Sequence, residues 1–477
     1  GSRETGTLAA VGETHVWVWK KPKVAVVSTG DELIAPGETM QLGRVYDSNS
    51  LVVGHAAEEL GCQVEFLGIV RDDEKQLEQV VRRGLEADML LLSGGTSKGE
   101  GDQNYRVFAQ FKNPGILVHG VSLKPGKPLC LAVLEGTPAA ILPGFPTSAI
   151  FTFTRFIAPV LREMAGLPPE KNTRLKAKVP LKIQSDKGRT EFNLIHLTDG
   201  PKGKAAYSTG KGSGSVTGFS RADGFMEIEK ETEMIEAGEE MEIQLLGDAV
   251  QLPDLMIIGS HCVGMDFLLG EMRQLGYQSR FIPVGSMGGV LAARRGECDL
   301  AGTHLMDEAS GIYNEHLLTQ GLKLVKAYRR GQGFIFREDD PRFQGFQDSF
   351  QERFEEMLSD PELRMINRNR GSGTRVLIDG LLGKHQPQGF LYEAKSHQAV
   401  AAAVAQSRAD WGVAIRSVAE DQGLGFIPLQ DEEYDFIIPE SRLQKPAVQA
   451  LIGLLDEKPI IERLEQMGLI RNPGKDR

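Results

Sequence analysis

The stretch Met89-Leu90-Leu91-Leu92-Ser93-Gly94-Gly95-Thr96-Ser97-Lys98-Gly99-Glu100-Gly101-Asp102 decides the fold of the first part of this chain. Its apolar beginning predicts a short buried strand, and the glycines that follow predict a tight loop. Such a loop at the end of a strand leaves backbone N–H groups free to bind a phosphate. The stretch therefore indicates an α/β sheet that binds its ligand beyond the carboxyl ends of its strands.

The segments on either side of this stretch alternate between strand and helix patterns. We expect strands at 24–28 and 64–70, and helices at 48–60 and 75–86. Alternation of this type predicts a parallel, doubly wound sheet, which we expect to end near Gly166.

The rest of the chain predicts two further folding units. Short alternating runs after residue 167 indicate a small all-β domain. A second α/β alternation begins at Leu255 and continues to the end of the chain. The strand-like segments 323–325 and 425–427 could each connect two lobes, so we expect a two-lobed α/β domain.

Composition narrows the classes of function. A chain of 477 residues predicts two to four domains, and a net charge of -11 argues against nucleic acid as the main partner. The 4 cysteines are widely spaced, which favours a reduced, cytoplasmic setting. We expect no membrane association, because no apolar run approaches the roughly 20 residues that span a bilayer.

Five loop motifs are expected at one edge of the first sheet. In chain order they are Thr29-Gly30-Asp31-Glu32-Leu33, Asp72-Asp73, the glycine-rich loop 93–102, Lys124-Pro125-Gly126-Lys127-Pro128, and Leu142-Pro143-Gly144-Phe145-Pro146-Thr147-Ser148. Carboxylates would repel a phosphate unless a divalent cation such as Mg²⁺ lay between them. Each motif alone could be a plain turn or a solvated surface, so the prediction depends on their combination.

The order of these motifs resembles the third domain of the MoeA family of molybdopterin molybdenumtransferases, which is similar in fold to the MogA adenylyltransferases. The resemblance covers roughly residues 21–165, and the following β region resembles the fourth domain of the family. It implies insertion of molybdate or tungstate into adenylylated molybdopterin, with Mg²⁺ bound, by a homodimer.

The resemblance also implies roles for particular residues. Glu32, Asp72, Asp73 and Asp102 would be catalytic, and Glu32, Asp73 and Asp102 would hold the metal ion. Contacts to the pterin phosphate are implied for Thr29, Gly30, Gly94, Gly95, Thr96, Ser97, Lys124, Gly126, Lys127, Pro143, Gly144 and Ser148. Phe145 departs from the family, which usually has asparagine there, and only residues 6–19 resemble the end of the family's upstream region.

A second set of loops predicts an anion site in the last part of the chain. Ser260 and Ser286 follow strands, and Arg370-Gly371-Ser372-Gly373-Thr374 opens a helix. Hydroxyl groups, free N–H groups and arginines at helix starts suit a dehydrated tetrahedral anion, although such residues are also common helix caps.

This half resembles the periplasmic-binding-protein-like (PBP) domains fused to MoeA. Molybdate or tungstate is the expected ligand, with sulfate, phosphate or a pterin fragment as alternatives; His261 and His304 could approach it.

Together these features predict four segments and one main function. The segments are a cloning remnant with the end of an upstream region (1–20), a MogA-like domain (21–166), a small β domain (167–248) and a two-lobed PBP-like domain (249–477). The expected function is molybdenum cofactor biosynthesis. A sensor or storage protein that binds without reacting, and the adenylyl transfer of MogA relatives, are the alternatives. The carboxylates favour an enzyme, because anion storage alone does not need them.

Overall fold

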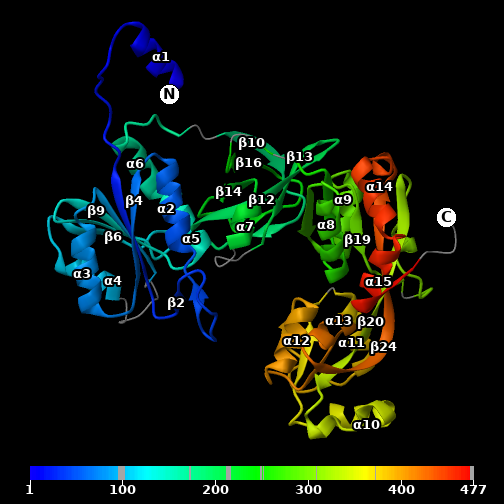
Figure 1. The fold of residues 1–477 in the computed structure, drawn as a ribbon. Coiled ribbons are helices and arrows are strands. Elements are labelled where there is room, and N and C mark those ends of the chain that lie inside the picture. Colours follow the sequence, from blue (N-terminus) through cyan, green and yellow to red (C-terminus); the bar gives the residue numbers. More distant parts are fainter. Residues whose placement is uncertain are drawn as a thin grey trace. The chain divides into compact units, whose positions relative to one another are not determined.

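The chain folds into two compact units. The computed structural model describes residues 1–94, 103–170, 173–210, 216–247, 250, 252–307, 309–370 and 372–472 (Figure 1). One unit comprises residues 1–197 and 206–250, and the other comprises 198–205 and 251–477. No helix among the described residues is long and apolar enough to cross a membrane.

The first unit is built on a six-stranded sheet with the order β4-β1-β5-β9-β8-β6. These strands are β1 (Lys23–Thr29), β4 (Gln63–Val70), β5 (Met89–Gly94), β6 (Gly115–His119), β8 (Cys130–Leu134) and β9 (Thr137–Leu142). Helices α2 (Asn49–Glu59), α5 (Pro146–Thr152) and α6 (Ala158–Met164) pack on one face of the sheet. Helices α3 (Glu74–Gly84) and α4 (Gln103–Gln110) pack on the other. The doubly wound fold predicted from the strand and helix pattern is therefore confirmed.

The sequence pattern predicted a parallel sheet, but the observed sheet is not parallel throughout. Strands β4, β1, β5 and β9 are parallel, whereas β8 and β6 run antiparallel to their neighbours. The reason is the tight turn between β8 and β9, where Glu135 and Gly136 both adopt positive φ. Two residues suffice for a hairpin but not for the crossover that a parallel pair requires.

A closed antiparallel sheet follows, most of which belongs to the first unit. Its strands are β10 (Arg174–Lys178), β12 (Thr190–Gly200), β13 (Gly203–Ser208), β14 (Gly224–Ile228) and β16 (Glu240–Leu245). Pairing between β13 and β12 closes the sheet, which leaves these strands without an open edge between them. The short strand β7 (Leu123–Lys124) pairs with β12, so the predicted Lys-Pro-Gly-Lys-Pro loop is attached to this sheet.

The second unit consists of two lobes. The first lobe contains β17 (Leu255–Gly259), β18 (Ser279–Pro283) and β19 (Ala301–Thr303), with helices α8 (Val263–Gln274), α9 (Gly285–Arg295), α14 (Pro446–Leu454) and α15 (Lys458–Gln466). The second lobe contains β21 (Met365–Arg368), β22 (Glu393–Ala394) and β23 (Trp411–Ile415), with helices α10 (Phe350–Leu358), α11 (Gly373–Leu382), α12 (His397–Ala405) and α13 (Arg416–Asp421). Each lobe has its own apolar core.

Two long strands run through both lobes. They are β20 (Leu322–Arg337) and β24 (Leu424–Pro439), which pair antiparallel along 16 residues each (Figure 1). Strand β24 also pairs with β19 in the first lobe, and β20 pairs with β23 in the second. The segments 323–325 and 425–427 lie on these strands, as the two-lobed prediction requires.

We predict that Gly259, at the end of β17, tolerates no side chain. A Cβ atom there would lie 2.5 Å from the carbonyl oxygen of Gly302. Gly259→Ala should therefore lower the free energy of unfolding of the second unit by about 1–3 kcal/mol, as overpacking usually does. Gly270→Ala is the matched control, since a Cβ atom there meets nothing within 4 Å, and alanine favours a helix by up to about 1 kcal/mol. Urea unfolding of both variants would check this, and equal midpoints would contradict it.

Candidate functional site

Two buried asparagines hold the strand ends of the first sheet together. The Asn104 side-chain amide donates to Thr29 Oγ1 at 2.6 Å and to the Gly94 carbonyl at 2.8 Å. The Asn49 amide donates to Ser93 Oγ at 2.9 Å and to the Gly144 carbonyl at 2.8 Å. The predicted site residues Thr29, Gly94 and Gly144 thus come together at one edge. The sequence reasoning missed both asparagines, whose only signal is their position at the start of a helix.

Glycine is required at two of the positions where these loops pack. A Cβ atom on Gly94 would lie 2.1 Å from the carbonyl oxygen of Thr29, and one on Gly144 would lie 3.5 Å from the Gly94 Cα. Gly126 has a φ of 118°, and a Cβ atom there would lie 2.7 Å from Thr152 Cγ2 in α5. The motifs of Gly94 and Gly126 therefore require glycine, whereas a Cβ atom at Gly144 would make only an ordinary contact.

Three carboxylates gather beside these loops. The Asp72 N–H donates to Asp31 Oδ1 at 3.3 Å. Burial, followed by the charges of Asp31 and Glu32, raises the pKa of Asp72. Because like charges raise one another's energy, a cation would stabilise this group. Even so, the described residues contain no group of three His, Cys, Asp or Glu side chains that could hold a metal ion.

Asp73 has a different surrounding from Asp72. Its carboxylate accepts a hydrogen bond of 2.8 Å from the Gln76 N–H and caps α3. A helix cap of this kind is a sufficient structural reason for an aspartate. Of the two adjacent candidates, Asp72 is the one that faces the other carboxylates.

The lysine loop is joined to the closed sheet. Lys124 Nζ lies 2.5 Å from an Asp186 oxygen and 3.2 Å from a Glu191 oxygen. Burial would lower the pKa of Lys124, but the hydrogen bonds to these two carboxylates outweigh it and raise the pKa. Ser148, another predicted contact, is buried within α5. Five predicted residues lie outside the described residues, namely Gly95, Thr96, Ser97 and Asp102 in this unit and Gly371 in the other.

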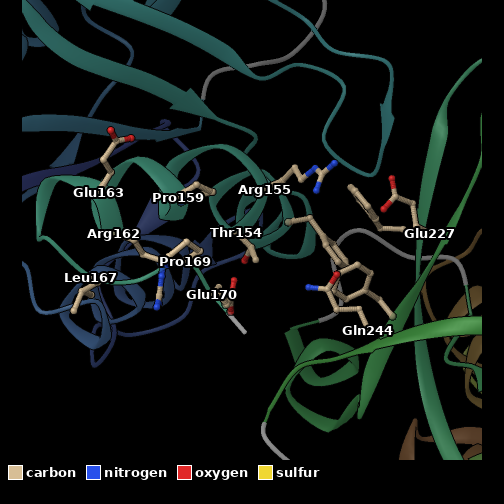
Figure 2. A pocket seen from close by; sticks show the side chains of 13 residues that line it. Thr154, Arg155, Pro159, Arg162, Glu163, Leu167, Pro169, Glu170, Glu227 and Gln244 are labelled. Carbon is tan, nitrogen blue, oxygen red and sulfur yellow. The ribbon is translucent and has the colours of Figure 1, made fainter. Parts of the chain in front are cut away.

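The first unit also contains a cavity that the sequence did not predict. It has a volume of ≈ 510 Å³ and lies between α6 and strands β12, β14 and β16 (Figure 2). At its apolar side Phe151 stacks on Phe192, and both rings meet Phe225 edge to face, with ring centroids 5.2–5.5 Å apart. Arginine and glutamate side chains stand around it, including Arg155 and Glu227 (Figure 2). None of the predicted site residues lines this cavity.

In the second unit, the predicted serines lie around one histidine. Ser260 Oγ is 2.8 Å from His304 Nε2, and Ser286 Oγ accepts a hydrogen bond of 3.2 Å from the His304 N–H. From the other lobe, Gly373 comes close, because a Cβ atom there would lie 3.4 Å from His304 Nδ1. Ser372 caps α11 by accepting from the Arg375 N–H. The structure therefore brings Ser260, Ser286 and Gly373 together where the lobes meet.

A buried ion pair occupies the centre of this region. Arg330 Nε donates to Glu432 Oε2 at 2.6 Å, and the two side chains are 2% and 1% exposed. The other carboxylate oxygen of Glu432 accepts from His304 Nδ1. Burial would raise the pKa of Glu432, but the charge of Arg330 and the hydrogen bond with His304 hold it well below its ordinary value. Glu432 is therefore ionised at neutral pH.

The same region contains unused donors. Within the part of the chain that the structure describes, Arg330 Nη1, Arg368 Nε and Arg368 Nη1 have no hydrogen-bond partner, and neither has Thr374 Oγ1. Burial and the neighbouring charge of Arg330 lower the pKa of Arg368 to about 10. His397 opens α12 nearby, and burial together with Arg368 and Arg330 lowers its pKa well below 6.5. Buried donors without partners next to positive charge are suited to an anion.

The sequence motif predicted Arg370 as the contact to the anion, but the buried arginine is Arg368, two residues earlier. Arg370 is exposed, whereas Arg368, at the end of β21, is buried. Strand alternation could have separated the adjacent Arg329 and Arg330, of which only Arg330 is buried. It could not separate Arg368 from Arg370, because Arg368 ends β21 and Arg370 lies in the loop that follows. Glu432 carried no signal of its own. Arg375 is fully engaged by Asp379, Glu393 and the Arg368 carbonyl.

Comparisons with known families cover most of the chain in three parts. Residues 25–163 match the family model described as "Probable molybdopterin binding domain", and residues 176–246 match "MoeA C-terminal region (domain IV)". Residues 269–456 match "PBP superfamily domain". These matches agree with the resemblances seen in the motifs.

Individual relatives match about half of the chain. The molybdopterin molybdenumtransferase of Haemophilus influenzae is 31% identical over 241 residues, which are 50% of this chain and 59% of that protein. Molybdopterin molybdenumtransferase 2 of Mycobacterium tuberculosis is 30% identical over 243 residues, 50% of this chain and 60% of that protein. The chain thus spans less than two thirds of the length of these relatives.

Two solved structures each match about half of the chain. A MoeA protein from Pyrococcus horikoshii has 36% sequence identity and a TM-score of 0.46, covering 52% of this chain and 60% of that one. An ABC-type phosphate transport receptor from Vibrio cholerae has 16% identity and a TM-score of 0.34, covering 45% of this chain and 99% of that one.

We predict that the Glu432 charge stabilises the second unit. Glu432→Gln leaves Arg330 and Arg368 buried without a counter-charge, and should lower the free energy of unfolding by about 3–5 kcal/mol near neutral pH. The folded-state pKa of Glu432 is depressed, so its stabilisation is present above the ordinary value of 4.5 and is lost as pH falls below it. The difference between wild type and variant should therefore narrow below pH 4.5 in chemical unfolding. A difference that stays constant into acid would contradict the assignment.

Proposed function

We propose that this chain, which carries MoeA-like molybdopterin-binding and domain IV modules followed by a PBP-like domain, acts in molybdenum cofactor biosynthesis. It would insert molybdate or tungstate into adenylylated molybdopterin. The second unit would bind the oxyanion. The observation that supports this most directly is the meeting of glycine-lined loops with Asp31, Glu32 and Asp72 at one edge of the first sheet.

In the first unit, different residues would bind the phosphate and the metal ion. Backbone N–H groups near Gly94 and Gly144 would hold the phosphate of the pterin, because glycine lets the backbone approach it closely. Glu32 and Asp72, with Asp102, would hold Mg²⁺, since their mutual repulsion is relieved by a cation. When bound, Mg²⁺ would supply charge neutralisation at the phosphoanhydride. The carboxylates would orient the adenylylated substrate for cleavage as the oxyanion is ligated.

The second unit would bind the oxyanion where its lobes meet. Arg330 and Arg368 offer guanidinium N–H groups that no described residue uses, and Thr374 offers its hydroxyl. A buried guanidinium forms strong charge-assisted hydrogen bonds with tetrahedral anions. Ser260, Ser286 and Gly373 lie next to this group through their contacts with His304. The donor set is thus larger than the sequence motifs indicated.

A non-catalytic sensor or storage protein remains the second candidate. It is favoured by Phe145, whose side chain is 62% exposed at the position where relatives usually supply an asparagine. Turnover distinguishes the enzyme from the sensor, because a sensor would bind adenylylated molybdopterin and the oxyanion without releasing AMP.

Glu32→Gln in the full-length protein tests the enzymatic role. Loss of one magnesium ligand should lower the rate of AMP release from adenylylated molybdopterin, with molybdate and Mg²⁺ present, by at least about 100-fold. Glu65→Gln is the matched control, because Glu65 forms an exposed ion pair with Arg83. An unchanged rate in the Glu32 variant would remove this carboxylate from the mechanism. No AMP release from the unaltered protein would favour the sensor.

Arg368→Ala tests the oxyanion site. Removing a buried donor group should weaken molybdate binding by about 10- to 100-fold in calorimetry, whereas Arg370→Ala, at an exposed position, should change it by less than about 3-fold. The reverse ranking would mean that the loop predicted from sequence, and not the buried cluster, holds the anion. If molybdate, tungstate, sulfate and phosphate all bind more weakly than about 1 mM, the oxyanion role is wrong.

A further inference from the structure

We propose that Ser260, His304 and Glu432 form a serine hydrolase site in the second unit, which cleaves small esters that carry an anionic group. This activity goes beyond molybdenum insertion and does not depend on it. Ser260 Oγ lies 2.8 Å from His304 Nε2, and His304 Nδ1 forms a hydrogen bond with Glu432 Oε1. A hydroxyl, an imidazole and a carboxylate joined in this order are the groups that activate a serine for nucleophilic attack.

The direction of the hydrogen bonds follows from the charge of Glu432. An ionised carboxylate can only accept, so His304 Nδ1 must carry the proton that it shares with Glu432. In a neutral imidazole the other nitrogen, Nε2, is then an acceptor. The Ser260 hydroxyl therefore donates to His304 Nε2, which is the arrangement a general base requires.

Each of the three groups is held by further contacts. The Tyr434 hydroxyl donates to the Ser260 carbonyl, and the Tyr434 ring stacks on His304 with an interplanar angle of 16°. The His304 N–H donates to Ser286 Oγ, and Arg330 holds the second oxygen of Glu432. Fixed orientation of the base matters, because catalysis falls steeply when reacting groups are misplaced.

The location of Ser260 suits a nucleophile. It stands between the end of β17 and the start of α8, a helix of 12 residues, and it is only partly buried. His304 follows the end of β19 in the same lobe. Loops at the carboxyl ends of such strands are where α/β folds bind their ligands. The amino end of α8 adds positive potential, which favours the oxyanion that forms on an attacked carbonyl group.

The surrounding charges define the substrate class. Arg330 Nη1 and two nitrogens of Arg368 lack partners among the described residues, and both side chains are buried. Buried guanidinium groups of this kind select a substrate that brings its own negative charge. From α11, Gly373 places no side chain beside His304 and Glu432, and a Cβ atom there would lie 3.4 Å from each.

The reaction is balanced with water as the only co-reactant. Ser260 Oγ would attack the ester carbonyl carbon and pass its proton to His304 Nε2. The bond to the leaving oxygen then breaks, His304 protonates that oxygen, and an acyl-serine remains. Water, deprotonated by His304, attacks the acyl-serine, and the proton returns to Ser260 Oγ as the acid leaves. Glu432 stays ionised throughout and stabilises the imidazolium.

Labelling with a fluorophosphonate probe tests the nucleophile in the complete chain. We expect one covalent adduct, located on Ser260 by peptide mass spectrometry. Ser260→Ala and His304→Ala should abolish it, and Ser220→Ala, an exposed serine of the first unit, should leave it unchanged. Absence of an adduct on Ser260 in the unaltered protein would overturn the proposal. If molybdate still binds that protein, only the hydrolase is refuted and the oxyanion role stands.

Hydrolysis of 4-acetoxybenzoate, compared with neutral phenyl acetate, tests the reaction and the anion preference. Ser260→Ala removes a single oxygen and should lower kcat for 4-acetoxybenzoate by at least about 1,000-fold. Arg368→Ala should raise KM for 4-acetoxybenzoate by at least about 10-fold while leaving phenyl acetate within about 3-fold. Unchanged turnover in Ser260→Ala, with circular dichroism showing a folded protein, would sink the proposal. Equal effects of Arg368→Ala on both esters would refute the anionic substrate class.

Discussion

The second unit depends on one buried carboxylate. Glu432 is 1% exposed and is shared between Arg330 and His304. Removing charges from water is costly, so two buried guanidinium groups are tolerated only beside a counter-charge and a ligand that completes their hydrogen bonds. Arg330 and Glu432 occupy paired positions on β20 and β24, the strands that run through both lobes. Strand pairing therefore places the ion pair where both lobes contribute residues.

Several properties follow from that placement. His304 reaches Glu432 from the first lobe, while Arg368 and Gly373 reach the same region from the second. Glu432 neutralises one of the two arginines, which leaves net positive charge and unpaired donors for an anion. The same carboxylate sets the proton on His304 Nδ1, so that Ser260 donates to Nε2. The Arg330–Glu432 ion pair thus contributes to the stability of the fold, to anion binding and to the orientation of the proposed nucleophile.

The first unit handles negative charge by different means. Among the described residues, the buried arginines all belong to the second unit. In the first unit two asparagine amides join the loops of Thr29, Gly94 and Gly144. Backbone N–H groups and a cation, held by the carboxylates near Asp72, would replace the guanidinium groups of the second unit. Such a site can bind a phosphorylated substrate and polarise it, whereas the guanidinium site suits capture of a small anion.

Local pattern in the sequence determined the strand and helix order, the two-lobed architecture and the strand-end loops, because hydrophobic periodicity and glycine positions act over a few residues. Only the tertiary structure decided which polar residues meet. Glu432 and Arg330 are 102 positions apart, and their contact depends on the register between β20 and β24. The structure also separated Asp72 from the helix cap Asp73, and buried Arg368 in place of Arg370. Adjacent side chains such as those of Asp72 and Asp73 point in different directions, whereas Arg368 lies at the end of a strand and Arg370 in the loop after it. In both cases the tertiary packing selects which side chain is buried.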